Sequence, residues 1–161
     1  TPYIQRGKGD NTNGYEIELT GALSENWDLS ASYSKHKTKS KDGEVLYTYE
    51  PKQLLNIFTT YDFNRYLQGF TAGIGVNWTG DFYKDIDRPT ADGSVEDYRF
   101  EQSSTLLVNL MARYAINDKT SVSLNINNLF DKHYYDSVSY WSGSVLHGEP
   151  VNWKLALRYS W

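Results

Sequence analysis

Alternation of apolar and polar residues runs through most of the chain and restricts its possible folds more than any other feature. The segment EPVNWKLALRYSW shows it clearly: every second residue from Val151 to Trp161 is apolar, whereas Lys154 and Arg158 fall on the other parity. Successive side chains of a β-strand point to opposite faces. The segment therefore predicts a strand with one apolar face and one polar, charged face.

About seven segments alternate in this way. By number they cover 14–24, 27–34, 53–63, 70–80, 105–116, 119–130 and 149–161. Within them the charged residues fall on the polar parity: Glu16, Glu18, Asp28, Asp62, Arg113, Lys154 and Arg158. Lys35, Lys37 and Lys39 depart from this rule because they continue the apolar parity of Trp27 to Tyr33. We infer that this strand leaves the apolar layer near Tyr33.

The connectors and the aromatic residues indicate which face looks outward. Connectors of hairpin length alternate with long polar ones at 37–49, 83–99 and 131–148, as in outer-membrane barrels. Aromatic residues cluster at the strand ends, like the girdles of such barrels. A soluble β-sandwich also alternates, but polar faces that mix charges with Gly, Ser, Thr and Asn suit a wet lumen better. We predict an all-β, antiparallel transmembrane β-barrel whose apolar face meets lipid.

Strand number and charge narrow the prediction further. About seven strands fall below the minimum of eight for a bacterial single-chain barrel, so the chain reads as the last third of a larger one.

A net charge of -4 argues against nucleic acid as a partner. With no cysteine there is no thiolate metal site, and neither the acidic stretch 85–97 nor His36, His133 and His147 has the spacing of a metal site. We expect the inward charges of the first, fifth and seventh strands to pair with one another, the alternative being that they hold a polar plug inside the barrel.

Two stretches carry a resemblance to a known family. The run SLNINNLFDKHYY (123–135) resembles the penultimate-strand signature of TonB-dependent outer-membrane receptors. The run GEPVNWKLALRYSW resembles the final strand of their siderophore-receptor branch, with Val151 where an Arg is usual and Trp161 where a Phe is usual. The matching positions are Asn125, Asn128, Leu129, Phe130, Asp131, Lys132, Tyr135, Gly148, Glu149, Pro150 and Asn152.

The resemblance implies a 22-strand barrel, closed by an N-terminal plug, in the outer membrane of a Gram-negative bacterium. Residues 1–161 would be the C-terminal part of that barrel, with the plug and the TonB box outside them, so this part alone is not expected to transport. The implied cargo is a ferric siderophore, with no resident cofactor and no enzymatic activity. The implied partners are TonB, ExbB and ExbD, outer-membrane lipid and lipopolysaccharide, and the barrel-assembly machinery, which would read the terminal aromatic Trp161.

A siderophore-binding mouth would use rings on the extracellular side. The long loop 131–148 supplies Tyr134, Tyr135, Tyr140 and Trp141, which either contact ligand or pack the loop. The alternative is a small stand-alone outer-membrane barrel with a structural, adhesive or hydrolase role. The hydrolase version would pair Ser137 or Ser139 with His133 or His147.

Overall fold

The computed structural model describes residues 9–89, 94–139 and 144–161, and in this part of the chain every regular element is a strand. The strands, in chain order, are β1 (Asn11–Ser24), β2 (Trp27–Lys39), β3 (Val45–Leu46), β4 (Gln53–Asp62), β5 (Phe70–Thr79), β6 (Phe82–Pro89), β7 (Val95–Gln102), β8 (Thr105–Asn117), β9 (Thr120–Asn127), β10 (Tyr135–Val138), β11 (Val145–His147) and β12 (Asn152–Tyr159). No helix in this part is long and apolar enough to cross a membrane.

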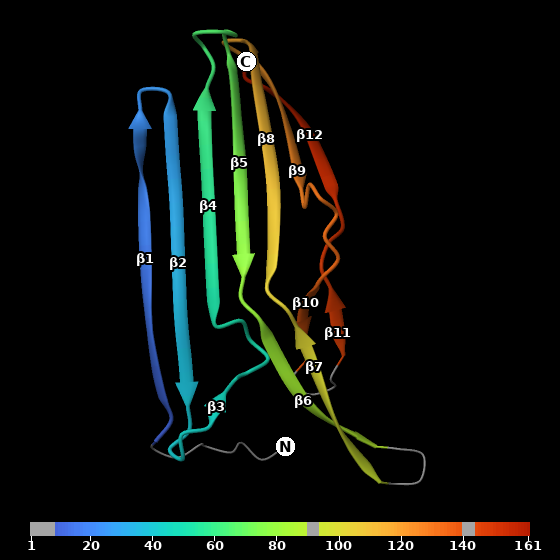
Figure 1. Cartoon of the computed structure of the whole chain (residues 1–161). Helices are drawn as coiled ribbons and strands as arrows, with labels where there is room; N and C mark the ends of the chain where they lie inside the picture. Colours follow the sequence, from blue (N-terminus) through green and yellow to red (C-terminus); the bar gives the residue numbers. More distant parts are fainter. Residues whose placement is uncertain (1–8, 90–93, 140–143) are drawn as a thin grey trace.

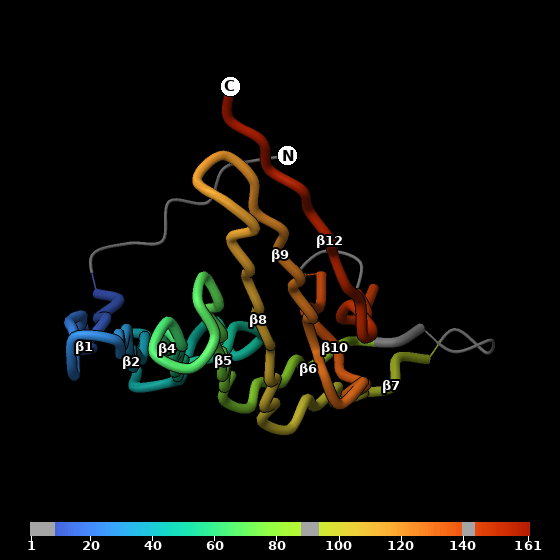
Figure 2. The backbone as a smooth tube through the Cα atoms, turned by 90° about the horizontal axis from the view of Figure 1, so that it is seen from above, coloured from blue at the N-terminus to red at the C-terminus, as the bar shows by residue number. Residues whose placement is uncertain are grey.

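The main sheet is a single antiparallel path in the order β1-β2-β4-β5-β8-β9-β12, and β3 pairs with the end of β2. Viewed along the strands, the path is one open layer (Figure 2). Short turns join its strands at one end, and the long connections lie at the other (Figure 1). The seven predicted strands are thus confirmed, although the sixth ends at Asn127 instead of residue 130 and the first begins as early as Asn11.

The register gathers the apolar parities of all seven strands on one face. Ala31, Ile57, Val76 and Val108 lie opposite one another across four neighbouring strands. The next row on the other face begins with Ser32, Asn56 and Asn77. A slip of one residue in any pair would exchange the two faces, so the pattern itself specifies this register.

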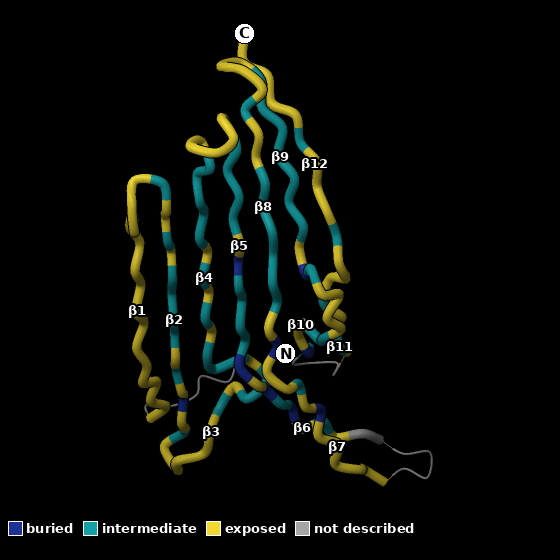
Figure 3. The backbone as a smooth tube through the Cα atoms, turned by 45° about the horizontal axis from the view of Figure 1, so that its top comes forward, coloured by how far each residue is buried: buried dark blue, intermediate teal, exposed yellow. Residues whose placement is uncertain are grey.

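The apolar face has no protein cover in the described residues. Ile17, Trp153 and Leu157 are 61%, 71% and 72% exposed, and the buried apolar core consists of Phe82, Phe100 and Val138, all in the long connections. Buried segments are sparse along the strands of the main sheet (Figure 3). An exposed apolar surface of this extent indicates a lipid-facing wall.

Aromatic rings border this wall at both ends. The ring centroids of Tyr15 and Tyr33 lie 5.9 Å apart at the loop end, and those of Phe63 and Phe70 lie 5.6 Å apart at the short-turn end. Phe70 and Trp78 bound β5, and their eight-residue separation corresponds to about 27 Å of strand. At a tilt of about 45° the wall between them is about 19 Å tall, near the roughly 25 Å apolar band of membrane barrels.

The long connections are more ordered than the sequence predicts. The stretches 83–99 and 131–148, expected as polar loops, contain the hairpins β6–β7 and β10–β11. Phe82 and Phe100 pack with Val138 from the second hairpin, so the two connections share one core. Lys84 interrupts the apolar face of β6, and its buried ammonium donates to the carbonyl of Ser139 at 2.5 Å. Burial lowers the pKa of this lysine.

Candidate functional site

A chain of asparagine side chains crosses the polar face of the sheet. Asn77 Nδ2 donates to Asn56 Oδ1, and Asn109 Nδ2 donates to Asn77 Oδ1, both at 2.7 Å. Asn109 Oδ1 in turn accepts the backbone N–H of Asn128 at 3.0 Å. We call Asn56, Asn77, Asn109 and Asn128 the asparagine ladder. It joins β4, β5 and β8 to the end of β9 through neutral groups that satisfy one another.

Asn128 ends the ladder and fixes the connection that follows β9. It is 4% exposed and its φ is 48°, a left-handed conformation that asparagine tolerates better than most residues. Its Oδ1 accepts the N–H of Lys132 at 2.8 Å, and its Nδ2 donates to the carbonyls of Lys132 and Glu149 at 3.0 and 2.9 Å. One side chain therefore ties the start of the connection to its end.

The other motif positions strengthen the same junction. Asp131 Oδ1 accepts the N–H of Val151 at 2.9 Å, and Asn152 Nδ2 donates to Glu149 Oε2 at 3.2 Å. Gly148 leaves room for a ring, because a Cβ at this position would overlap Tyr134. The motif residues thus shape the loop end of β9 and β12. Phe130 and Trp161 are different: they are 75% and 98% exposed.

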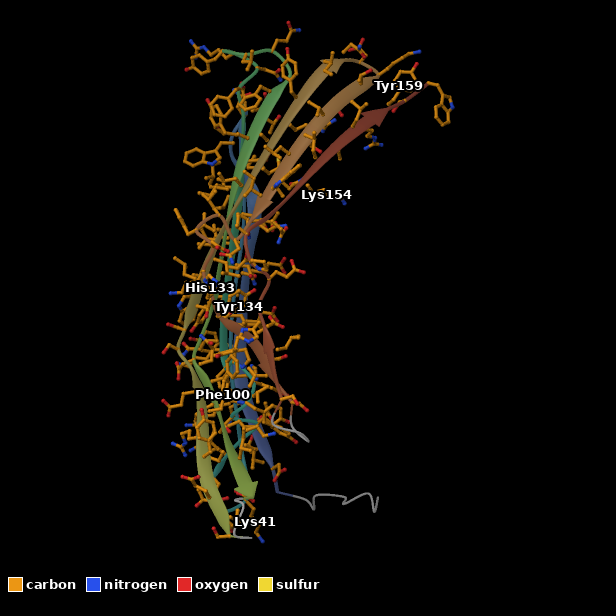
Figure 4. All side chains as sticks on the ribbon, turned by 90° about the vertical axis from the view of Figure 1, so that its right-hand side faces the viewer. Lys41, Phe100, His133, Tyr134, Lys154 and Tyr159 are labelled. Carbon is orange, nitrogen blue, oxygen red and sulfur yellow. The ribbon has the colours of Figure 1, made fainter. Side chains whose placement is uncertain are left out.

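A recess of about 350 Å³ opens on the polar face at this junction. Its wall includes Asn127, Tyr134, Asp136, His147 and Glu149. Burial raises the pKa of the Tyr134 phenol, and the nearby carboxylates of Asp136 and Glu149 raise it further. The phenol therefore stays protonated and can donate a hydrogen bond at the edge of the recess. Tyr134 lies where the sheet meets the loops, with Phe100 farther out (Figure 4).

The structure brings together only part of the predicted aromatic set. Tyr134 lines the recess, whereas Tyr135 packs in the loop core, with its ring 5.2 Å from Phe100 and 4.8 Å from His147. Tyr140 and Trp141 lie outside the described residues. The ladder residues Asn56, Asn77 and Asn109 were not predicted. The sequence pattern that could have indicated them is an asparagine at a polar-face position in each of three neighbouring strands.

The expected pairing among the inward charges is wrong. In the described residues, no ion pair joins Glu16 or Glu18 to Arg113, Lys154 or Arg158. The sheet order explains this, because β1 and β8 are four strand steps apart, about 19 Å at 4.8 Å per step. Glu16 and Glu18 lie on β1, whereas the basic residues of the polar face lie on β8 and β12. Lys154 projects from β12 away from the sheet (Figure 4).

The described residues contain no group of three His, Cys, Asp or Glu side chains placed to hold a metal ion. The recess combines amides, one phenol, one imidazole and two carboxylates with the apolar side chains of Leu107 and Leu146. Such a surface can hydrogen-bond and pack against a bulky polar ligand.

Comparison with known proteins agrees with this geometry. Residues 1–129 match the model of the TonB dependent receptor-like β-barrel. The chain belongs to this family. It is 34% identical over 158 residues to the ferripyoverdine receptor of Pseudomonas aeruginosa and 35% identical to the ferric-pyoverdine BN7/BN8 receptor of Pseudomonas putida. These alignments take in 98% of this chain but 19% and 18% of the relatives, so this TonB-dependent receptor chain spans about a fifth of their length.

A solved structure shows the same architecture. The crystal structure of the ferripyoverdine receptor of the outer membrane of P. aeruginosa, bound to ferripyoverdine, superposes with a TM-score of 0.84 and 35% identity. The match covers 93% of this chain and 19% of that one. The predicted β-barrel fold and the outer-membrane location are thereby confirmed.

Proposed function

We propose that this chain forms the C-terminal part of the barrel wall in a receptor that binds a ferric siderophore of the ferric-pyoverdine class and imports it across the outer membrane. The observation that carries the proposal is its 34–35% identity, along almost its whole length, to two receptors named for ferric pyoverdines. The open sheet supports a larger barrel over a small stand-alone one, because in the described residues β1 and β12 each have one strand partner.

In this proposal the siderophore is cargo and the chain has no enzymatic role. The recess beside Tyr134 lies at the loop end of the polar face, where a ligand entering from outside first meets the lumen wall. Tyr134 would contact the ligand directly, together with Tyr140 and Trp141 of the same connection. Tyr135 would act mainly by holding the loop core against Phe100.

The remaining partners follow from this role. TonB, ExbB and ExbD would act through a plug domain lying outside residues 1–161. The barrel-assembly machinery would recognise the terminal strand through Trp161, which is 98% exposed and lies two residues past the end of β12.

The test is ferripyoverdine binding by the complete receptor, followed with a radioactive iron label in the siderophore. We expect Tyr134→Phe to weaken binding about fivefold to tenfold, since it removes one hydrogen bond and keeps the ring. The matched control is Tyr98→Phe, because Tyr98 is 50% exposed on β7 and does not line the recess. Absence of any ferripyoverdine binding by the wild-type receptor would refute the proposed ligand, and equal effects of both variants would refute the role of Tyr134.

A further inference from the structure

Three lysines stand on the lipid-facing side of β2, beyond its aromatic border. Lys35, Lys37 and Lys39 share the parity of Trp27, Leu29, Ala31 and Tyr33, and all three are exposed. The opposite parity turns the other way, because Thr38 is buried and its hydroxyl lies 2.8 Å from that of Thr12 on β1. The outward row therefore changes from apolar to cationic directly after Tyr33.

The lysine row lies on a part of the sheet that extends past its neighbours. Lys35 pairs with Gln53, the first residue of β4, so Lys37 and Lys39 lie beyond the end of that strand. Figure 1 shows β1 and β2 continuing past β4 and β5 on the loop side. Two residues of strand span about 6.7 Å, so at a tilt of about 45° the three Cα atoms stand about 5, 10 and 14 Å above Tyr33.

Those heights span the headgroup layer of the outer leaflet and the space directly above it. The headgroup region adds about 5–8 Å to each side of the hydrocarbon core. Tyr15 and Tyr33, whose rings lie 5.9 Å apart, mark the upper border of the apolar wall. Lys35 would lie within the headgroup layer, and Lys37 and Lys39 directly above it.

Nothing in the described protein neutralises these charges. The cross-strand neighbours of the three lysines on β1 are Tyr15, Asn13 and Asn11, and none is acidic. No ion pair involves the three lysines within the described ranges. Protection of an exposed sheet edge is another use of lysines, but β2 is an interior strand, paired with β1 on one side and with β4 and β3 on the other.

We propose that Lys35, Lys37 and Lys39 form a binding site for the phosphate groups of lipopolysaccharide on the outer face of the barrel. The row presents three ammonium groups at about 7 Å intervals, with Tyr15 beside Lys35 and Tyr33 beneath the row for the lipid's acyl region. The site depends on the outer-membrane location of the chain and is independent of the cargo the receptor carries.

The test compares lipopolysaccharide binding by the complete receptor and two double variants in detergent micelles, using fluorescent rough lipopolysaccharide as the probe. Removing two lysines by Lys35→Gln and Lys37→Gln should weaken binding about 25-fold, at about fivefold per lysine near an anionic surface. Arg65→Gln with Lys119→Gln is the control: it also removes two exposed cations, but from the short turns at the other end. This control should bind like the wild type.

Three further readings decide the outcome. Dephosphorylated lipopolysaccharide should bind no better to the wild type than to the lysine variant. Wild-type binding should weaken when sodium chloride rises from 50 to 500 mM, a measurement that requires no variant to fold. Equal affinity of the lysine and control variants, or wild-type binding that is insensitive to salt, would overturn the proposal. Ferripyoverdine binding by the same preparations, measured in parallel, reports separately on the proposed cargo.

Discussion

Replacing Asn128 by alanine should loosen the junction between β9 and β12 by about 4 kcal/mol. The side chain makes three hydrogen bonds to backbone groups of Lys132 and Glu149, at 2.8 to 3.0 Å, and is 4% exposed. Losing them costs about 1 kcal/mol each, since the partners lie in a part-buried junction. Alanine at φ 48° adds about 1 kcal/mol of backbone strain.

The assay is hydrogen exchange of the Lys132 amide in the complete receptor, because this N–H donates to Asn128 Oδ1. Local opening should rise about 10³-fold, at tenfold per 1.4 kcal/mol. Asn127→Ala is the matched control: Asn127 is exposed and its Nδ2 donates to Asn152 Oδ1 at 2.9 Å. The control should change exchange at Lys132 by less than tenfold.

A second substitution separates the two causes. Asn128→Gly removes the same hydrogen bonds but tolerates the positive φ, so it should be about 1 kcal/mol milder than Asn128→Ala. If Asn128→Ala altered protection at Lys132 no more than Asn127→Ala does, the side chain would not hold the junction, and the assignment would fail.

Three other perturbations test separate parts of the structure. Gly148→Ala should destabilise the loop by about 1–3 kcal/mol through overlap with the Tyr134 ring, and adding Tyr134→Ala should recover part of that loss in a thermal-unfolding double-mutant cycle. Hydrogen bonds from Arg99 to Asp85, at 2.6 and 3.0 Å, hold the pKa of that carboxyl below its ordinary value. The stabilisation by this ion pair should therefore be fully present at pH values above the ordinary carboxyl pKa and be lost as the pH falls through the lowered pKa of Asp85. A carboxyl ¹³C titration that gave Asp85 an ordinary pKa, or a pKa that Arg99→Gln did not alter, would contradict this. Trp161→Ala should reduce the heat-modifiable, assembled receptor in the outer membrane while Trp161→Phe preserves it, and equal levels would rule out the proposed signal.

The main sheet could be predicted because its information is local. Each strand carries its own period of two, and a misplaced register would have put Lys154 or Glu16 into lipid. The hairpin β6–β7 escaped prediction because Lys84 interrupts the row formed by Phe82 and Ile86, which made the segment read as polar. Its stability comes from Phe100 and Val138, whose contacts join residues far apart in the sequence.

Only part of the candidate site could be predicted, because its contacts also join residues far apart in the sequence. The motif showed that Asn128 and Gly148 matter, but not that one ties the loop together and the other makes room for Tyr134. The ladder partner Asn109 lies on β8, and only the three-dimensional register aligns it with Asn77. Charge pairing was mispredicted because parity identifies the face of a residue but not its distance from other residues on that face.

The shared core of the long connections limits how the mouth of the receptor can move. Phe82 and Phe100 from one connection, Val138 and Tyr135 from another, and Tyr49 from a third pack together. Lifting any one of them alone would expose buried aromatic surface to water. In the proposed receptor, the three connections would therefore move as one unit.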